Sequence, residues 1–201
     1  MFSMQKWWVQ CSAALVACAA LAVSAQVAPD AQVKAVATEV TGLLKSDPSI
    51  LGNQAKLRDL IETKLVPNFN FARMTQLAMG RNWSKASPEQ QATLTKEFRT
   101  LLVRTYSASL ANFKNNTIDY RPLRMQPNDT DVTVKTVVQQ ANGQGIPIDY
   151  SMEKGADGSW KAYDVAVAGV SLVTNYRDEF NSVISGQGVD ALIKQLQSKN
   201  K

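Results

Sequence analysis

The spacing of the apolar residues changes near Asn115 and Asn116 in this chain. Before that point, apolar positions repeat at intervals of three and four residues, which is the spacing of amphipathic helices. From about Thr117 to Val167, apolar and polar residues alternate, and Val, Ile, Thr and Tyr become common, as they are in strands. Helical spacing then returns up to the end. Helices, then strands, then helices predict the α+β class rather than an alternating parallel-sheet fold.

The predicted helices cover residues 31–45, 57–65, 71–79 and 87–113, followed by 174–185 and 188–197. The longest begins at Ser87-Pro88-Glu89-Gln90, where proline stands in the first turn and Ser87 and Gln90 can form a capping box. The predicted strands cover 117–125, 131–139, 146–153 and 160–167, joined by glycine-containing turns. The first should be an edge strand because Pro122 cannot donate to a ladder. We therefore expect one domain in which a curled antiparallel sheet of about four strands packs against a layer of helices.

The first 25 residues have the pattern of an export signal peptide. Lys6 is their only charge, an apolar run follows, and small residues end at Ala25, where we expect cleavage. The mature protein would then be a single periplasmic domain of residues 26–201. A competing interpretation is a lipoprotein cleavage box at residues 15–18, which would leave Cys18 lipidated. The mass of the mature N-terminus distinguishes the two.

Several chemistries are excluded or disfavoured by composition. The chain has no histidine, and both cysteines lie in the predicted signal, so histidine triads, disulfides and most zinc sites are excluded from the mature domain. Ser171 and Asp164 lack a catalytic partner in the sequence, and structural roles such as helix capping are favoured for both. We therefore predict no catalytic residue, no metal site and no enzyme.

The charge of the chain is weakly positive. Removing Lys6 with the signal lowers the formal net charge from +5 to +4, and the basic residues are dispersed rather than clustered. This pattern favours a solvated surface over nucleic-acid binding. A weak positive field is compatible with anionic lipid head groups or an acidic partner.

Specific strings add a family resemblance to this pattern. They are Phe69-Asn70-Phe71-x-x-Met74, Gly80-x-x-Trp83, Tyr163-Asp164-Val165, the block from Gly169 to Phe180, and Gly188-x-Asp190-x-Leu192-Ile193. Together they closely resemble the MlaC family, the periplasmic phospholipid-binding component of the Mla intermembrane transport system, also known as toluene-tolerance proteins. The similarity runs from about Ala31 to Gln197. Asn70 departs from the aspartate expected there, which puts a local cap or hydrogen bond in doubt.

The resemblance implies a nuclear-transport-factor-like sheet and a helical layer that enclose a deep apolar cavity. The cavity would take the acyl chains of a phospholipid, the cargo and only ligand, and leave the head group outside. The family shuttles lipid between an outer-membrane lipoprotein-porin complex and an inner-membrane ABC transporter with a substrate-binding ring protein, and so maintains outer-membrane lipid asymmetry. We accordingly expect a monomer that contacts these complexes transiently and accepts several head groups.

The apolar stripes of the two layers supply the residues expected to line the cavity. Taken alone, such stripes are typical of an ordinary core, and periodicity cannot say whether the layers touch. The expected lining residues are Phe71, Met74, Leu101, Leu102, Tyr106, Val134, Val138, Ile148, Tyr150, Met152, Val165, Val170, Leu172 and Tyr176.

Two alternatives remain open at this stage. One is a small-molecule enzyme of a cone-shaped α+β fold, with Asp164, Tyr163 and Arg177 in its cavity. The other is a periplasmic adaptor whose core is fully packed and which binds no ligand.

Overall fold

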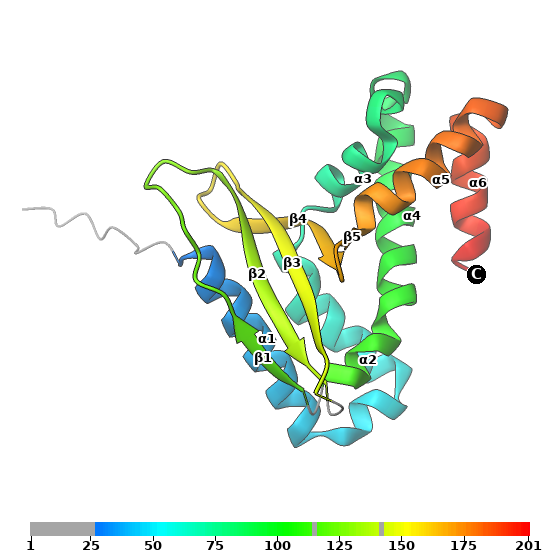
Figure 1. Cartoon of the computed structure of the whole chain (residues 1–201). Coiled ribbons are helices and arrows are strands. Elements are labelled where there is room, and N and C mark those ends of the chain that lie inside the picture. Colours follow the sequence, from blue (N-terminus) through cyan, green and yellow to red (C-terminus); the bar gives the residue numbers. More distant parts are fainter. Residues whose placement is uncertain (1–26, 114–115, 141–142) are drawn as a thin grey trace, which may run out of the picture.

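A computed structural model describes residues 27–113, 116–140 and 143–201, drawn in colour in Figure 1. The predicted signal peptide and the alternative at Cys18 lie outside these residues. In chain order, the helices before the sheet are α1 (Pro29–Ser46), η1 (Pro48–Gly52), α2 (Gln54–Leu60), η2 (Ile61–Leu65), η3 (Val66–Asn68), α3 (Phe71–Met79), η4 (Gly80–Lys85), α4 (Pro88–Ser107) and η5 (Ala108–Phe113). The strands are β1 (Thr117–Tyr120), β2 (Asp131–Gln139), β3 (Gly145–Lys154), β4 (Trp160–Val167) and β5 (Val170–Ser171), and the last helices are α5 (Leu172–Gln187) and α6 (Val189–Lys199). The α+β class is confirmed. No helix in the described ranges combines the length and apolarity needed to cross a membrane.

The longest helix begins where its sequence predicts. The Gln90 amide donates to Ser87 Oγ at 3.2 Å, and the Ser87 amide donates to Gln90 Oε1 at 2.9 Å, so the predicted capping box is present. These two bonds satisfy amide groups that would otherwise have no partner in the first turn of α4. The start of α4 is thereby fixed, and its apolar stripe turns toward α3, α5 and α6.

The strands form one antiparallel sheet in the order β1-β2-β3-β4-β5. The predicted meander and its edge strand are confirmed, although β1 ends at Tyr120, before Pro122. The sheet gains a fifth strand because the chain reverses sharply after β4, where Ala168 has φ 51° and Gly169 has φ 82°. This reversal pairs Val167 with Val170 and leads directly into α5.

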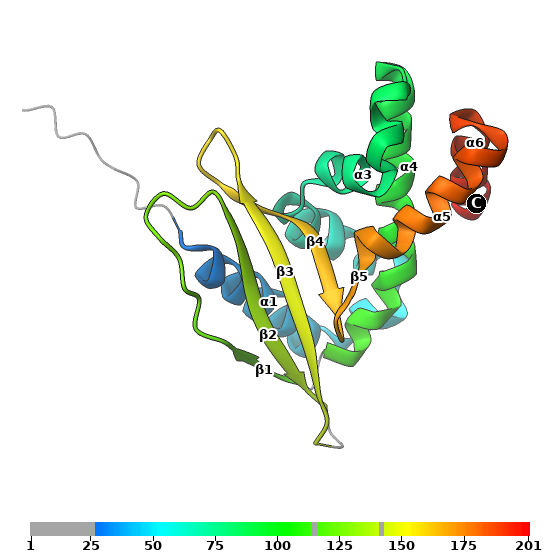
Figure 2. The same cartoon turned by 45° about the horizontal axis from the view of Figure 1, so that its top comes forward.

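The helices are arranged in two groups around the sheet. In Figures 1 and 2, α1 lies behind the strands, while α3, α4, α5 and α6 stand to one side and meet the sheet through β4 and β5. The layers are also tied together by the chain before α3, where the Asn70 amide donates to the Ala162 carbonyl at 2.8 Å. The sheet is thus attached to the helical layer along β4, which lies next to the edge strand β5 and far from β1.

The buried apolar residues fall into three separate clusters. The first lies within α3, η4, α4, α5 and α6 and includes Phe98, Phe180 and Leu192. The second joins α1 to the turns around α2 through Leu44 and Ile61. The third lies on the sheet and includes Val132, Val134, Met152, Trp160 and Ala162. The partly buried Phe69 packs against both the first and the third cluster, so these two meet at the chain segment before α3.

Candidate functional site

One face of the sheet is predominantly apolar across all five strands. Because facing residues in an antiparallel pair project to the same side, the register defines this surface, which we call the inner face. One row across it runs Tyr120, Thr136, Ile148, Val167, Val170, and the next runs Val134, Tyr150, Val165. The inner face includes Ile118, Tyr120, Val132, Val134, Thr136, Val138, Ile146, Ile148, Tyr150, Met152, Trp160, Ala162, Val165, Val167 and Val170.

A β-bulge keeps this face apolar along β4. The register shifts between Ser151 and Met152, so Tyr150 pairs with Val165 whereas Met152 pairs with Ala162. Strict alternation would instead have put Tyr163 on the same side as Val165. The bulge turns Tyr163 away, and its hydroxyl donates to Asp131 Oδ1 at 3.0 Å. The inner face therefore presents a small alanine at this position in place of a polar aromatic ring.

The sheet residues predicted to line the site all lie on the inner face. Their burial differs with position, from 1% exposed for Val134 and Met152 to 60% for Val170 at the β5 edge. Val138 and Ile148 are 3% and 6% exposed, yet neither belongs to any of the three clusters. These two side chains are thus removed from solvent at a place where the described clusters do not meet.

The predicted residues of the helical layer are gathered in the first cluster. Met74, Leu101, Leu102 and Tyr176 are buried members of it, and Phe71 packs against it. The Phe98 ring contacts that of Tyr176 edge-on, with centroids 5.0 Å apart. The structure thus brings the predicted residues together as two groups, one on the helices and one on the sheet. Leu172 is half-buried at the start of α5, next to β5.

Tyr150 is a partly buried residue of the inner face. Its side chain retains some accessible surface, yet burial, helped by the neighbouring Tyr120, raises the pKa of its hydroxyl to about 12, with a hydrogen bond to Thr136 acting in the opposite direction. A group that keeps accessible surface while losing most of its hydration must be surrounded by protein on several sides.

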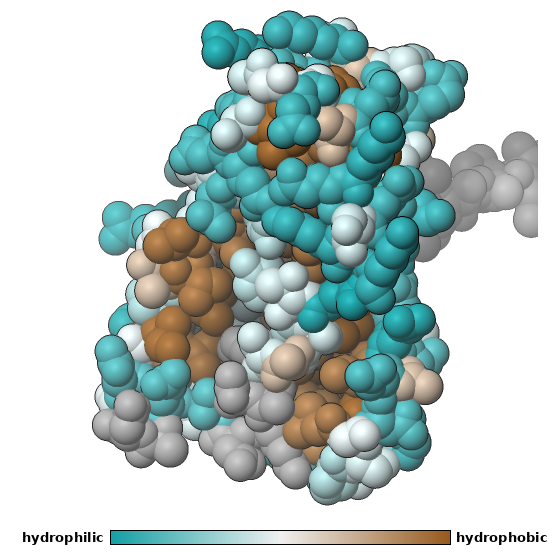
Figure 3. Space-filling view, turned by 90° about the vertical axis from the view of Figure 1, so that its right-hand side faces the viewer, coloured by the Kyte–Doolittle hydropathy of each residue, from teal (hydrophilic) through white to brown (hydrophobic). Residues whose placement is uncertain are grey.

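A second tyrosine pair lies where α4 meets α5. Tyr176 is 8% exposed and Tyr106 is 36% exposed. Burial raises the pKa of both hydroxyls, and the two interact with each other. Tyr106 is one of the larger apolar side chains that remain accessible, together with Val167 and Val170 of the hairpin before α5. Accessible apolar surface is also seen in Figure 3, where it forms separate patches with hydrophilic surface between them.

The residues expected to line the cavity did not include several residues of the inner face. Ile118 and Tyr120 of β1, Thr136 of β2, and Ile146 and Val167 project to the same side as the predicted set. The signal for Ile118, Tyr120 and Ile146 was present, because each continues the alternation of its strand. Ala162 could not be found in this way, since the bulge that brings it to this face leaves no sequence signal.

Asp164, Tyr163 and Arg177, the residues of the enzyme alternative, each make separate structural contacts. Asp164 accepts from Ser171 Oγ at 2.5 Å and from the amides of Val165 and Val173, so its predicted role beside the helix cap is confirmed. Arg177 Nε donates to the Leu77 carbonyl at 2.9 Å. With Tyr163 bound to Asp131, the three do not converge on a shared cavity. The described part of the chain contains no group of three or more acidic, Cys or His side chains placed to hold a metal.

Asn70 retains the helix cap that its departure from aspartate had put in doubt. Its Oδ1 accepts from the Arg73 amide at 3.0 Å, as an aspartate would. Its Nδ2 also donates to Glu153 Oε1 of β3 at 2.7 Å, which a carboxylate could not do. The asparagine thus caps α3 and connects it to the sheet.

Comparison with known proteins gives consistent results. A sequence model of the MlaC protein family matches residues 34–198. The chain is 27% identical over 156 residues to the intermembrane phospholipid transport system binding protein MlaC of Haemophilus influenzae, covering 77% of this chain and 70% of that protein. It is 28% identical over 172 residues to toluene tolerance protein ttg2D of Pseudomonas putida, covering 85% and 79%. A solved structure of a phospholipid-binding protein from Ralstonia solanacearum, in complex with a phospholipid, superimposes with a TM-score of 0.79 at 42% identity, covering 85% of this chain and 96% of that one.

Proposed function

Because this chain belongs to the MlaC family, we propose that it is a periplasmic carrier that binds a phospholipid by its acyl chains between the inner face of the sheet and the helical layer. The relatives are named for phospholipid binding and intermembrane transport. In this proposal, the acyl chains contact the fourteen residues predicted from the sequence together with their neighbours on the inner face. No residue is assigned a catalytic role.

The observation that carries the proposal is the predominantly apolar surface across five strands. Ordinary sheets reach this state when helices cover them and the two layers merge into one core. Here the buried residues of the sheet and of the helical layer form two clusters that are joined through the partly buried Phe69, and Val33 of α1 packs on the sheet cluster. The buried Val138 and Ile148 belong to neither cluster. In this proposal, two hydrocarbon chains lie between the sheet cluster and the helical cluster.

The energetics of an aqueous lipid carrier require such a site. Each methylene group removed from water contributes about 0.8 kcal/mol, so two chains of roughly fifteen carbons represent on the order of 20 kcal/mol. A protein that extracts a lipid from a bilayer has to match most of that free energy with its own apolar contacts. An apolar surface that spans a whole sheet can supply such contacts, whereas scattered surface residues cannot.

We propose further that the chain is exported with cleavage after Ala25. It would then carry lipid as a monomer between an outer-membrane lipoprotein-porin complex and an inner-membrane ABC transporter with its substrate-binding ring protein. Without a concentrated arginine cluster, it should accept several head groups. Lipid extracted from the purified protein is accordingly expected to be a mixture, and the mass of the mature N-terminus tests the cleavage site.

The central test places a charge on the inner face. Val138→Asp puts a carboxylate among the proposed acyl contacts and is expected to abolish the lipid that copurifies with the wild-type protein, measured by native mass spectrometry. The neighbouring Val137 pairs with Pro147 and projects to the opposite face, so Val137→Asp is the matched control and should keep its lipid. Circular dichroism verifies that each variant is folded.

A second variant covers the case in which Val138→Asp fails to fold. Val170 lies on the same face and is 60% exposed, so Val170→Asp should cost little stability while reducing lipid content. Wild-type protein that carries no phospholipid, or a Val137→Asp variant that loses as much lipid as the inner-face variants, would overturn the proposal.

A further inference from the structure

The beginning of α1 lies on the inner face of the sheet. Val33 packs on the sheet cluster that includes Val132 and Met152. The ammonium group of Lys34 stands over the ring of Tyr120 in β1, 5.8 Å from its centroid. Figure 2 shows α1 running behind the strands on this side. The first turns of α1 therefore cover part of the surface proposed to bind acyl chains.

The two halves of α1 are attached to the rest of the fold differently. The second half is anchored, because Val40 and Leu44 are 4% and 0% exposed and belong to the second apolar cluster. From Ala31 to Glu39, in contrast, no side chain is fully buried. Since the burial of apolar surface is the main stabilising term in packing, the first half is held on the sheet less strongly than the second half is held in its cluster.

The turn that joins the two halves is a weak part of the helix. The Thr41 hydroxyl donates to the Ala37 carbonyl at 2.8 Å and to the Thr38 carbonyl at 3.1 Å. Such side-chain bonds compete with the backbone bonds of a helix and often bend it. Gly42 follows, and after proline, glycine is the least favourable residue in a helix interior. Residues 37–42 thus have the properties of a hinge.

One side chain connects the first half of α1 to the elements around the sheet by hydrogen bonds. Gln32 Nε2 donates to the Trp160 carbonyl of β4 and to Asn68 Oδ1 of η3, each at 2.9 Å. Asn68 is itself fixed, since its Nδ2 donates to the Lys64 carbonyl at 2.8 Å. Within the ranges that the structure describes, no other side chain of residues 29–36 donates to or accepts from a different element.

We infer that residues 29–36 form a lid over the acyl-chain site, that Gln32 is its latch, and that its opening limits the rate at which lipid enters and leaves. This inference rests on the proposed function. Two hydrogen bonds contribute only modestly to stability, so the latch can break in a local opening that leaves the sheet and the anchored half of α1 folded. Bending at residues 37–42 would then uncover the inner face.

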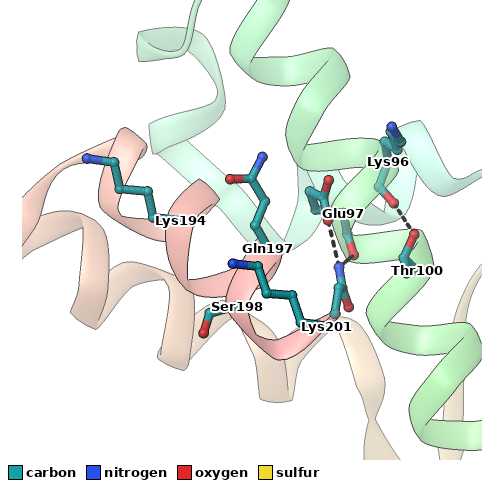
Figure 4. A pocket seen from close by; sticks show the side chains of 8 residues that line it. Lys96, Glu97, Thr100, Lys194, Gln197, Ser198 and Lys201 are labelled. Carbon is teal, nitrogen blue, oxygen red and sulfur yellow. Dashed lines mark hydrogen bonds between the residues drawn. The ribbon is translucent and has the colours of Figure 1, made fainter.

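The groove between α4 and α6 is not an alternative route for acyl chains. It has a volume of about 620 Å³, and every residue that lines it is polar or charged, as Figure 4 shows for Lys96, Gln197 and Lys201. Hydrocarbon gains no apolar contact from such side chains.

Thiol labelling measures the opening of the lid without relying on lipid. Both native cysteines lie in the first 25 residues, so the exported mature chain carries only an engineered thiol. Val132→Cys places that thiol in the cluster beneath Val33. Gln32→Glu keeps the size of the latch but removes both donors, and it is expected to raise the rate of maleimide labelling at position 132 about tenfold.

Two controls accompany this measurement. Leu44→Cys reports on the anchored half of α1, and its labelling rate should not change when Gln32→Glu is added. Ala35→Glu adds the same negative charge at an exposed position of the lid without touching the latch, and it should leave the labelling at position 132 as in the protein with the native latch.

Lipid transfer tests whether the lid controls exchange. The probe is phosphatidylcholine with a fluorescent acyl chain, loaded on the protein and transferred to unlabelled phosphatidylcholine vesicles. Gln32→Glu should accelerate the transfer several-fold, and Ala35→Glu should not. A short, cleavable bismaleimide that joins Gln32→Cys to Asn68→Cys should stop the transfer until the linker is cut.

The lid and the proposed function fail in different ways. A wild-type protein that carries no phospholipid contradicts the proposed function, whereas faster labelling at position 132 in the Gln32→Glu protein still supports a moving lid. If phospholipid is bound but Gln32→Glu changes neither labelling nor transfer, the lid is wrong and the carrier stands. Equal acceleration by Ala35→Glu, or transfer that continues in the cross-linked protein, would also overturn the inference.

Discussion

Single polar side chains determine how the helical layer is attached to the sheet. Asn70 makes two contacts at once, because its Oδ1 caps α3 and its Nδ2 donates to Glu153 Oε1 at 2.7 Å. Glu153 also lies 3.7 Å from Arg73 Nε. Only a side chain with both an acceptor and a donor can make both contacts of Asn70. This explains why asparagine can stand at a position where the family resemblance implies aspartate.

We predict that Asn70→Asp lowers the free energy of unfolding at neutral pH by about 1–2 kcal/mol. The cap would persist, but the hydrogen bond to Glu153 would be replaced by two carboxylates in contact, a repulsion that Arg73 offsets only in part. Urea denaturation measures the change, and Asn70→Ser, which keeps a capping oxygen without adding a charge, is the control. Wild-type stability in the aspartate variant would show that the bond to Glu153 contributes nothing.

The raised pKa of the Tyr150 hydroxyl determines how the stability of the fold varies at high pH. Its hydroxyl has a pKa of about 12 in the folded chain, raised from 10.0 chiefly by burial. Between these values, the unfolded chain loses the proton and the folded chain keeps it. Stability is therefore undiminished below pH 10 and falls as the pH rises toward 12, by up to about 1.4 kcal/mol per pH unit.

The tyrosinate absorbance of the native protein measures this shift. Because the pKa values of the other tyrosines are also raised, the wild type must be compared with Tyr150→Phe. The variant should lack the last-titrating group and lose less stability above pH 10. If the two titration curves differ instead near pH 10, the hydroxyl of Tyr150 is solvated rather than buried.

At the scale of elements, Asp164 holds together a strand, a hairpin and a helix. Its carboxylate accepts from the side chain of Ser171 and from the amides of Val165 and Val173, while Ser171 Oγ caps α5 through the Thr174 amide at 3.0 Å. The start of α5 is thereby fixed to β4. This explains why α5 begins at Leu172, two residues before its predicted start.

We expect Asp164→Ala to destabilise the fold by roughly 2–4 kcal/mol, because it leaves three donors without their acceptor. Ser171→Ala removes only the cap and should cost about 1 kcal/mol. Thermal and urea unfolding of the two variants provide the comparison. Similar losses for both would mean that Asp164 acts only through the serine.

The sequence predicted the longer elements well because their signals are local. The stripe and capping box of α4, and the alternation of β2 and β3, are properties of consecutive residues. The two-residue strand β5 and the bulge facing Ser151 and Met152 are not, since both depend on contacts made after the chain folds back. The predicted helix at 57–65 is divided into α2 and the π-helical turn η2, a division that spacing alone does not indicate.

For the whole molecule, the candidate site was predictable on the sheet and less so on the helices. Alternation fixes which face a strand residue joins, so the predicted sheet residues share one surface. A helical stripe shows only that a side chain is turned inward. Leu101 and Leu102 pack inside the helical cluster, and no periodicity distinguishes a helix packed on other helices from one that faces a sheet across a ligand.

The separation of the apolar core into three clusters has a thermodynamic consequence if a lipid lies between them. The cargo would then act as a structural component, and by mass action its binding would raise the unfolding free energy by RT ln(1 + [L]/Kd), about 2.7 kcal/mol when the free ligand is at a hundred times Kd. An unloaded carrier would be the more fragile species, so its survival in the cell would depend on how quickly it is refilled.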